Sequence, residues 1–450
     1  MDTSSLNKPT NPSFCLIPRV STFMRLLVYL LIITGITGQL FFSIPVGEYQ
    51  IFLFRLLLFF LWFLFLLKIL FNRGRINIAF IRIKPYLLFL IIWFSYAILS
   101  WGWAISKTGA AKYTYFLFAG FSIIFFIVFY LRSLKNLKTL YILWILILIL
   151  LLAIGFWEHL TGNHLSTSKY VIEGGDPKIK FSPAATFYNP NNFAAYLALS
   201  FPFILAWLYY KKRIIEQFLG LTLLFGSVYL LITTNARIIF LVLLLEVFIF
   251  LFFLRSLNKR IKFIVGICLI TALLFIILPD FVNSLLGQIN IQLKSFSSEY
   301  ELTEGSIAMR MALIKNALFS LTSSFGFGVG AGNIEWYIAE YQPYFSFGMT
   351  NVHNWWLEIL ANFGIFIFLG YLIFYFSLVR ALWKTYRYLT LNFEKIICET
   401  LLLGLMGFSI ACIGPSSIIA FKPQWLLFAF ALAFLNYYRN KYQIKGNYYL

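Results

Sequence analysis

The chain has 450 residues, of which 61% are hydrophobic, 20% aromatic and only 12% charged. This composition excludes an ordinary water-soluble globular protein and indicates an integral membrane protein. The formal net charge of +20 would point to nucleic acid in a soluble protein. In a membrane protein it reports the distribution of basic loops, so no nucleic acid is expected as a partner.

Apolar runs long enough to cross a bilayer as a helix recur along the whole chain, about twelve in number. They predict an all-α polytopic membrane protein, with residues 1–450 forming a single integral membrane domain in contact with membrane lipids. The first run follows a polar leader and precedes further spans, so we interpret it as an anchor rather than a cleaved signal peptide. The predicted spans are residues 24–44, 50–71, 85–104, 114–131, 139–157, 192–210, 214–233, 236–254, 262–279, 354–379, 396–414 and 418–437.

Lysine and arginine cluster in the short loops that would share one side of the membrane with the N-terminus, such as 73–84, 132–138 and 380–395. By the positive-inside rule these loops and both termini are cytoplasmic. Two larger polar segments then lie outside: a first outer loop at 158–191 and a large outer loop at 280–353.

The two outer loops differ in composition. The first is rich in Gly, Pro, Ser and Asn, which favours turns over a continuous helix. The second contains apolar positions around 309–318 at helical spacing, which predict a short amphipathic helix, followed by the glycine-rich turn FGFGVGAGN. No strand of a βαβ unit precedes this turn, so it makes a poor dinucleotide-binding motif.

Three ionisable residues stand at the outer membrane level, where an unpaired charge is costly and function is the default hypothesis: Arg237, Arg310 and His353. Arg237 is either a turn arginine that extends to the headgroups or an anion binder, since its planar fork suits phosphate oxygens. Arg310 would equally suit a solvated helix face. His353 is either satisfied by a backbone carbonyl or a general base at the water end of a span.

These residues fall within motifs that resemble the O-antigen ligase and O-antigen polymerase superfamily of bacterial envelope glycosyltransferases. The resemblance covers about residues 150–370, and the first five spans contribute only hydropathy. Ala236 stands where the family usually has serine, which removes a hydroxyl contact but leaves the arginine. The matching segments are HNWWLEILANFGIFIFLG (353–370), the glycine turn (325–333), TFYNPNNFAAYLALSFPF (186–203) and TTNAR (233–237).

The resemblance implies a multi-pass protein of the inner (cytoplasmic) membrane that uses an undecaprenyl-pyrophosphate-linked glycan as donor and a glycan or lipid as acceptor. His353 is then the catalytic base of an inverting displacement, and arginines neutralise the leaving diphosphate. The expected substrate-binding residues are Arg237, Arg310, Lys180, Asn191 and Asn354. No cofactor is expected and no metal either, because the three aspartates, Asp2, Asp176 and Asp280, form no clustered pair.

Polymerase and ligase activities share this donor and differ in the acceptor. The sequence bias toward Ile, Lys, Phe and Asn fits a low-GC genome, which favours a polysaccharide polymerase slightly over a ligase. A chain-length regulator is a further candidate partner. A transporter or flippase for polysaccharide or lipid-linked glycans is the rival hypothesis, because span count and charge balance suit it equally. Transporters often carry internal repeats and paired charged spans, and neither is visible here.

Overall fold

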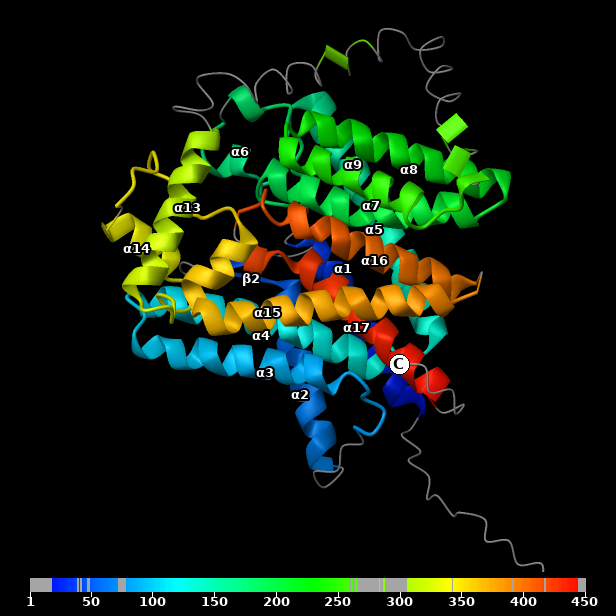
Figure 1. Cartoon of the computed structure of the whole chain (residues 1–450), viewed down its shortest axis with the longest axis horizontal. Helices are drawn as coiled ribbons and strands as arrows, with labels where there is room; N and C mark the ends of the chain where they lie inside the picture. The colour runs from blue at the N-terminus through cyan, green and yellow to red at the C-terminus, as the bar shows by residue number, and fades with distance from the viewer. Residues whose placement is uncertain are drawn as a thin grey trace, which may run out of the picture.

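The computed structural model describes residues 18–38, 40, 43–46, 49–71, 78–175, 177–258, 260, 261, 264, 265, 283, 286, 287, 306–341, 343–390, 392–416 and 418–443. Long helices dominate these residues, as Figure 1 shows. The α-helices are α1 (Pro18–Thr37), α2 (Leu53–Phe71), α3 (Lys84–Leu99), α4 (Lys107–Tyr130), α5 (Leu134–Thr161), α6 (Lys169–Ile172), α7 (Pro190–Tyr210), α8 (Ile214–Thr233), α9 (Arg237–Phe252), α13 (Ser306–Ser323), α14 (Ile334–Tyr341), α15 (Trp355–Tyr388), α16 (Phe393–Ala411) and α17 (Lys422–Gln443). Three short 3-10 helices are η1 (Ser100–Gly102), η2 (Pro177–Ile179) and η3 (Ile418–Ala420).

The all-α polytopic membrane fold predicted from the sequence is confirmed. Within the described residues, 7 helices are long and apolar enough to cross a membrane: α2, α3 with η1, α4, α5, α7, α8 and α15. The remaining predicted spans coincide with the shorter or more polar helices α1, α9, α16 and α17, except that the run at 262–279 lies outside the described residues.

The first two predicted spans have wrong boundaries, because an antiparallel hairpin separates them. Strand β1 (Ser43–Val46) pairs with β2 (Tyr49–Phe52), so that Ile44 faces Ile51 and Pro45 faces Gln50. Pro45 cannot donate a helical hydrogen bond, and the β-branched residues beside it fit a pleated strand. Helix α1 ends at Thr37, where Gly38 follows in a left-handed conformation with a φ of 61°, and α2 begins at Leu53.

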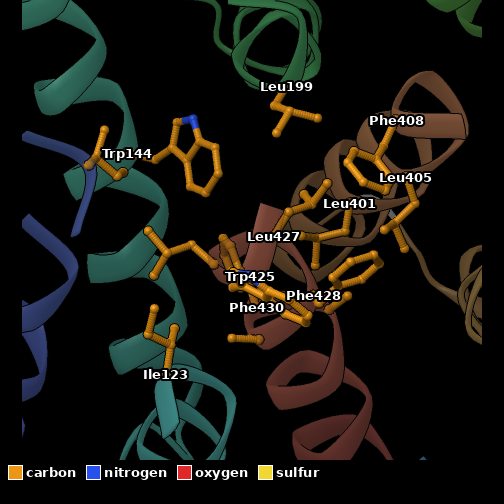
Figure 2. Packing of buried hydrophobic residues seen from close by; sticks show 14 of the residues in the cluster. Ile123, Trp144, Leu199, Leu401, Leu405, Phe408, Trp425, Leu427, Phe428 and Phe430 are labelled. Carbon is orange, nitrogen blue, oxygen red and sulfur yellow. The ribbon is translucent and has the colours of Figure 1, made fainter. Parts of the chain in front are cut away.

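Helix α17 lies in the centre of the helix bundle. Its side chains from Trp425 to Leu435 are buried without interruption, as expected of a helix that is apolar on all sides. Figure 2 shows Trp425 and Phe428 among side chains from α4, α5, α7 and α16. Gly120 of α4 leaves the space that Trp425 fills, since a β-carbon there would come within 2.5 Å of the indole ring. Small residues of this kind allow close helix packing in a membrane, where apolar burial alone gives little drive.

The connections between helices gather at two ends of the bundle. One end carries α6, α13 and α14 and is called the loop end below (Figure 1). There the Ser100 hydroxyl accepts a hydrogen bond from Ala331 N over 3.0 Å, which ties the α3–α4 connection to the glycine turn. The opposite end holds a buried ion pair between Arg255 and Glu399. The two ends contain the segments that the charge pattern assigned to the outer and inner sides, respectively.

Candidate active site

A cavity of about 800 Å³ opens at the loop end where distant segments of the chain meet. Its walls come from the first outer loop (169–191), the α8–α9 turn (234–235), one face of α13, the segment 349–353 and Ser416. Of the predicted site residues, His353, Arg310 and Asn191 line this cavity. Residues more than 100 positions apart in the sequence therefore share one space at the end of the bundle.

His353 lies half-buried just before α15, held by the asparagines around it. Its backbone has a φ of 51°, a left-handed conformation that is rare outside glycine, and its N–H donates to Asn351 Oδ1 over 3.0 Å. Asn351 in turn donates to Glu335 Oε1 of α14 over 2.6 Å. These contacts fix the backbone from which the imidazole projects. Its Nδ1 atom is buried and has no hydrogen-bond partner in the described part of the chain.

The surroundings of His353 keep its ring neutral. Burial lowers the pKa of His353 to about 4, and the positive charge of Arg310 acts in the same direction. The peptide groups of Gly414 and Pro415 raise the pKa, and the charge of Lys169 lowers it again. Above about pH 5 the ring is therefore neutral, which is the form that can accept a proton.

Arg310 and Lys169 bring two positive charges to the cavity wall, and Glu173 brings one negative charge. Arg310 is half-buried on α13 and donates to the Ile413 carbonyl over 3.1 Å, which sets its guanidinium against the α16–α17 connection. Lys169 of α6 lies 3.3 Å from Glu173, which also accepts from Tyr188 over 2.6 Å. Sequence reasoning missed Lys169, because nothing in a turn-rich loop indicates which of its lysines will face the cavity.

The Asn189–Asn191 segment begins α7 at the cavity wall. Asn189 caps the helix, accepting from Asn192 N over 2.9 Å, and its amide donates to Ser416 Oγ over 2.9 Å. Pro190 occupies the first helical turn, where its missing N–H costs nothing. The capped helix start thus presents Asn191 to the cavity.

Three predicted site residues lie next to lining residues without lining the cavity themselves. Arg237 is the first residue of α9, half-buried, two positions after Asn235 in the turn that forms one wall. Lys180 is exposed, with Nζ 5.6 Å from the centroid of the Phe181 ring. Asn354 accepts from Trp356 N over 3.1 Å and caps α15. Its side chain therefore shapes the helix start beneath His353.

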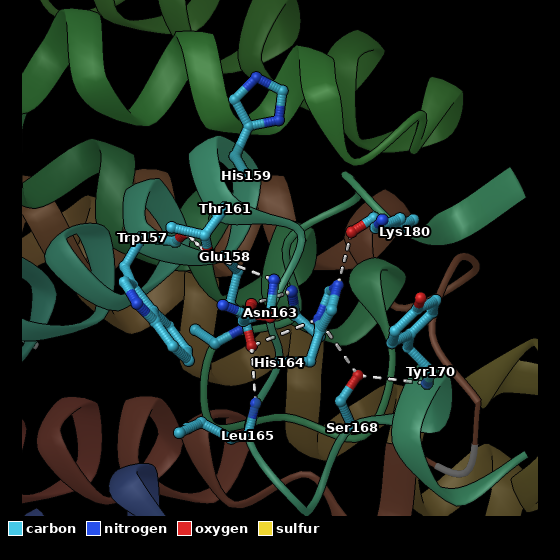
Figure 3. A network of polar contacts seen from close by, with 12 residues as sticks. Trp157, Glu158, His159, Thr161, Asn163, His164, Leu165, Ser168, Tyr170 and Lys180 are labelled. Carbon is cyan, nitrogen blue, oxygen red and sulfur yellow. Dashed lines mark hydrogen bonds and ion pairs between the residues drawn. The ribbon is translucent and has the colours of Figure 1, made fainter. Parts of the chain in front are cut away.

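A buried carboxylate organises the first outer loop. Glu158 accepts from the backbone N–H groups of Ala184 and Ala185, both over 2.7 Å, and lies 3.4 Å from His164 Nδ1 (Figure 3). The other ring nitrogen of His164 contacts the Lys180 carbonyl over 2.8 Å. These contacts link residues 158–185 of the first outer loop to one another. The buried pair of Glu158 and His164 therefore holds the shape of the loop, other residues of which line the cavity.

The glycine turn is a packing element. Gly328 has a φ of 81°, and a β-carbon there would come within 2.5 Å of Gly364 N. Val329 N donates to the Ala361 carbonyl over 2.9 Å, and Gly330 N to the Asn362 carbonyl over 3.0 Å. Only glycines allow the turn to approach α15 so closely. The contact coincides with a break in α15 at Gly364, where φ is 75° and ψ is −178°.

Among the described residues, no three His, Cys, Asp or Glu side chains lie close enough together to hold a metal ion. The three aspartates, Asp2, Asp176 and Asp280, lie outside the described residues.

A comparison with known proteins matches segments that include Arg310 and His353 of the candidate active site. Residues 221–372 match a family model described as O-antigen ligase. Over 419 residues the chain is 32% identical to the teichuronic acid biosynthesis protein TuaE of Bacillus subtilis (strain 168), an alignment that covers 93% of this chain and 85% of the relative. With this similarity along nearly its whole length, the chain belongs to the O-antigen ligase and polymerase superfamily of membrane proteins that make envelope polysaccharides.

Proposed function

We propose that this protein polymerises envelope polysaccharide by transferring lipid-linked glycan repeat units at the outer face of the cytoplasmic membrane. The donor is an undecaprenyl-pyrophosphate-linked glycan, and the acceptor is the hydroxyl of another glycan unit. One observation carries the proposal: His353, a candidate base kept neutral, and Arg310, a candidate diphosphate binder, line the same cavity.

The proposed reaction is a direct displacement at the anomeric carbon of the donor sugar. The acceptor oxygen forms the new glycosidic bond while the bond to the diphosphate oxygen breaks, so the configuration inverts. His353 takes the hydroxyl proton as the new bond forms. The departing diphosphate gains negative charge, which Arg310, with Lys169 and Arg237 nearby, neutralises without a metal.

The diphosphate also helps His353 to act as a base. A pKa of about 4 makes the free imidazole a weak proton acceptor, partly because of the charges of Arg310 and Lys169. An anion bound between these cations and the ring offsets their field and raises the pKa of His353. Proton uptake is then favoured only when the donor is in place.

The relative TuaE is named for the biosynthesis of teichuronic acid, a polymer, which favours polymerisation over single transfer to a lipid core. The decisive assay incubates the purified protein with lipid-linked repeat units. A ladder of lengthening products is expected for a polymerase, whereas a single shifted product on a different acceptor would identify a ligase.

Replacing His353 with alanine tests the catalytic assignment. We expect a rate loss of about a hundredfold or more, the usual contribution of a general base. His159→Gln is the matched control, because His159 contacts the Phe181 carbonyl and the Tyr229 hydroxyl and does not line the cavity. Retention of most activity by the folded His353→Ala protein would refute the role of His353.

A further inference from the structure

A second cavity, of about 500 Å³, adjoins the candidate active site. The two cavities share Tyr188 and Ser416 as lining residues. His353 and Arg310 line only the first cavity, whereas the second is lined by the end of α1, β2, α4, the first outer loop and the start of α17. A molecule in the second cavity would thus lie directly beyond a wall of the active site.

Lysine and arginine side chains lie at this second cavity, and no carboxylate among the described residues lines it. Lys112 and Lys422 line it, and Arg55 lies close enough to Lys422 for their charges to repel. The Phe52 ring contacts two of these cations, with its centroid 5.0 Å from the Arg55 guanidinium and 5.2 Å from Lys422 Nζ. An aromatic face attracts a cation but does not neutralise it.

No carboxylate pairs with Arg55, Lys112 or Lys422 in the part of the chain that the structure describes. Lys112 is exposed, whereas Arg55 and Lys422 are half-buried. Half-buried cations without a carboxylate partner are costly, and they are retained where they serve a function. A bound anion would remove their mutual repulsion and supply the missing partner.

The neutral part of the lining suits a sugar. Thr167 Oγ1 and Asn192 Oδ1 are buried and have no hydrogen-bond partner among the described residues, although buried polar atoms are nearly always paired. Both residues line the second cavity, together with the aromatic residues Phe52, Phe116, Phe187 and Phe421. Ring faces with a few fixed polar atoms are the usual lining of a small-molecule site, and hydroxyl groups of a sugar can pair with both unpaired oxygens.

We propose that the second cavity binds an acidic sugar of the acceptor glycan, with its carboxylate or phosphate ester between Lys422 and Lys112. The acceptor role rests on the proposed function, because the donor diphosphate is assigned to Arg310 in the first cavity. With its acidic sugar in the second cavity, the acceptor glycan extends past Tyr188 and Ser416 into the first cavity. There it presents a hydroxyl to His353.

Binding can be measured without catalysis. The full-length protein in phosphatidylcholine nanodiscs is titrated by NMR with cellobiouronic acid and with cellobiose, which differ by one carboxylate. We expect the acid to bind about tenfold more tightly, the value of one charge-assisted contact. Lys422→Gln and Lys112→Gln should each reduce the difference, whereas Lys107→Gln should preserve it, because Lys107 is on the same helix but lines neither cavity.

Equal binding of the two sugars, or a preference that survives in Lys422→Gln, would overturn the proposal. Glucose 6-phosphate serves as a second probe. If it displaces cellobiouronic acid and binds more tightly, the site takes a phosphate ester; if it binds more weakly, the site takes a carboxylate. Either outcome supports an anionic sugar.

Kinetics separates this inference from the proposed function. With acidic acceptor glycans and their carboxyl-reduced counterparts, Lys422→Gln should raise KM about tenfold for the acidic acceptor only, leaving donor KM and kcat unchanged. An equal rise of KM for both acceptors would refute the acidic-sugar subsite but would not contradict the proposed glycosyltransferase function. Absence of transfer by the wild-type protein would refute the proposed function, and the binding measurement would still decide the subsite.

Discussion

His353 shows how backbone contacts create a candidate base. Asn351 and Asn354 lie on either side of it in the sequence. The Asn351 side chain accepts from the N–H of His353 itself, and that of Asn354 accepts from Trp356 N at the start of α15. The histidine is thereby held in a left-handed conformation at the cavity wall, where burial and Arg310 oppose its protonation. Removing the positive charge of Arg310 should therefore change how the ring titrates.

The acid limb of the pH–rate profile tests this arrangement. The folded pKa of His353, about 4, is below the ordinary value of 6.5, so the neutral ring persists until the pH falls close to 4. We expect kcat/KM, which reports the free enzyme, to fall only near that pH, and kcat to fall at a higher pH because the bound diphosphate favours the imidazolium.

In Arg310→Gln the acid limb of kcat/KM should move to higher pH, since one charge that lowers the pKa of His353 is gone. The donor KM should rise as well. Lys315→Gln, a change at an exposed position on the same helix that does not line the cavity, is the control for non-specific charge effects. An unchanged acid limb in Arg310→Gln would show that Arg310 does not act on His353.

The sequence predicted some of the residues that line the first cavity and missed others for a definite reason. His353 and Arg310 belong to segments whose position at the membrane surface follows from hydropathy. Lys169, Glu173 and Ser416 reach the cavity only because the buried Glu158 shapes the first outer loop and the α16–α17 connection folds against it. These are tertiary contacts between distant segments, and one sequence does not reveal them.

At the scale of elements, the break in α15 was invisible in the sequence. Hydropathy predicted a continuous span at 354–379, and a single glycine inside an apolar run does not normally interrupt a helix. The structure explains the break by the glycine turn, which bonds α15 on both sides of Gly364: Val329 N and Gly330 N donate before it, and Ile365 N donates to Gly326 after it. The turn thus replaces helical hydrogen bonds lost at the break.

Gly364→Ala should destabilise the protein strongly. Its β-carbon would overlap the carbonyl oxygens of Gly326 and Phe327, and alanine disfavours a φ of 75°. Gly174→Ala is the control, because Gly174 also has a positive φ but meets no atom within 4 Å. We expect the control to lose about 1–2 kcal/mol and Gly364→Ala to lose clearly more, measured by thermal unfolding in detergent. Equal losses would mean that the turn and α15 can separate without penalty.

For the whole molecule, the pattern of apolar runs predicted where the helices are, and side-chain packing decides how they are arranged. Long apolar runs located the helices well, because in a membrane the backbone must satisfy its own hydrogen bonds and a helix does this locally. The central position of α17 was not predictable, since over its whole length it is more polar than helices at the surface such as α2 and α8. Its burial follows from Trp425 and Phe428 fitting beside Gly120 and between α4 and α16.

The arrangement of the two ends predicts the orientation of the whole protein. If the cationic inner loops hold their end in the cytoplasm, then the loop end, with both cavities, faces outward. Ser323 at the loop end and Thr390 at the opposite end are both exposed, so each can carry a single cysteine in a protein whose native Cys15, Cys268, Cys398 and Cys412 are replaced. A membrane-impermeant maleimide should label Ser323→Cys in intact cells and Thr390→Cys only after permeabilisation. The reverse pattern would place His353 on the cytoplasmic side, away from any donor already carried across the membrane, and the proposed polymerisation at the outer face would fail with it.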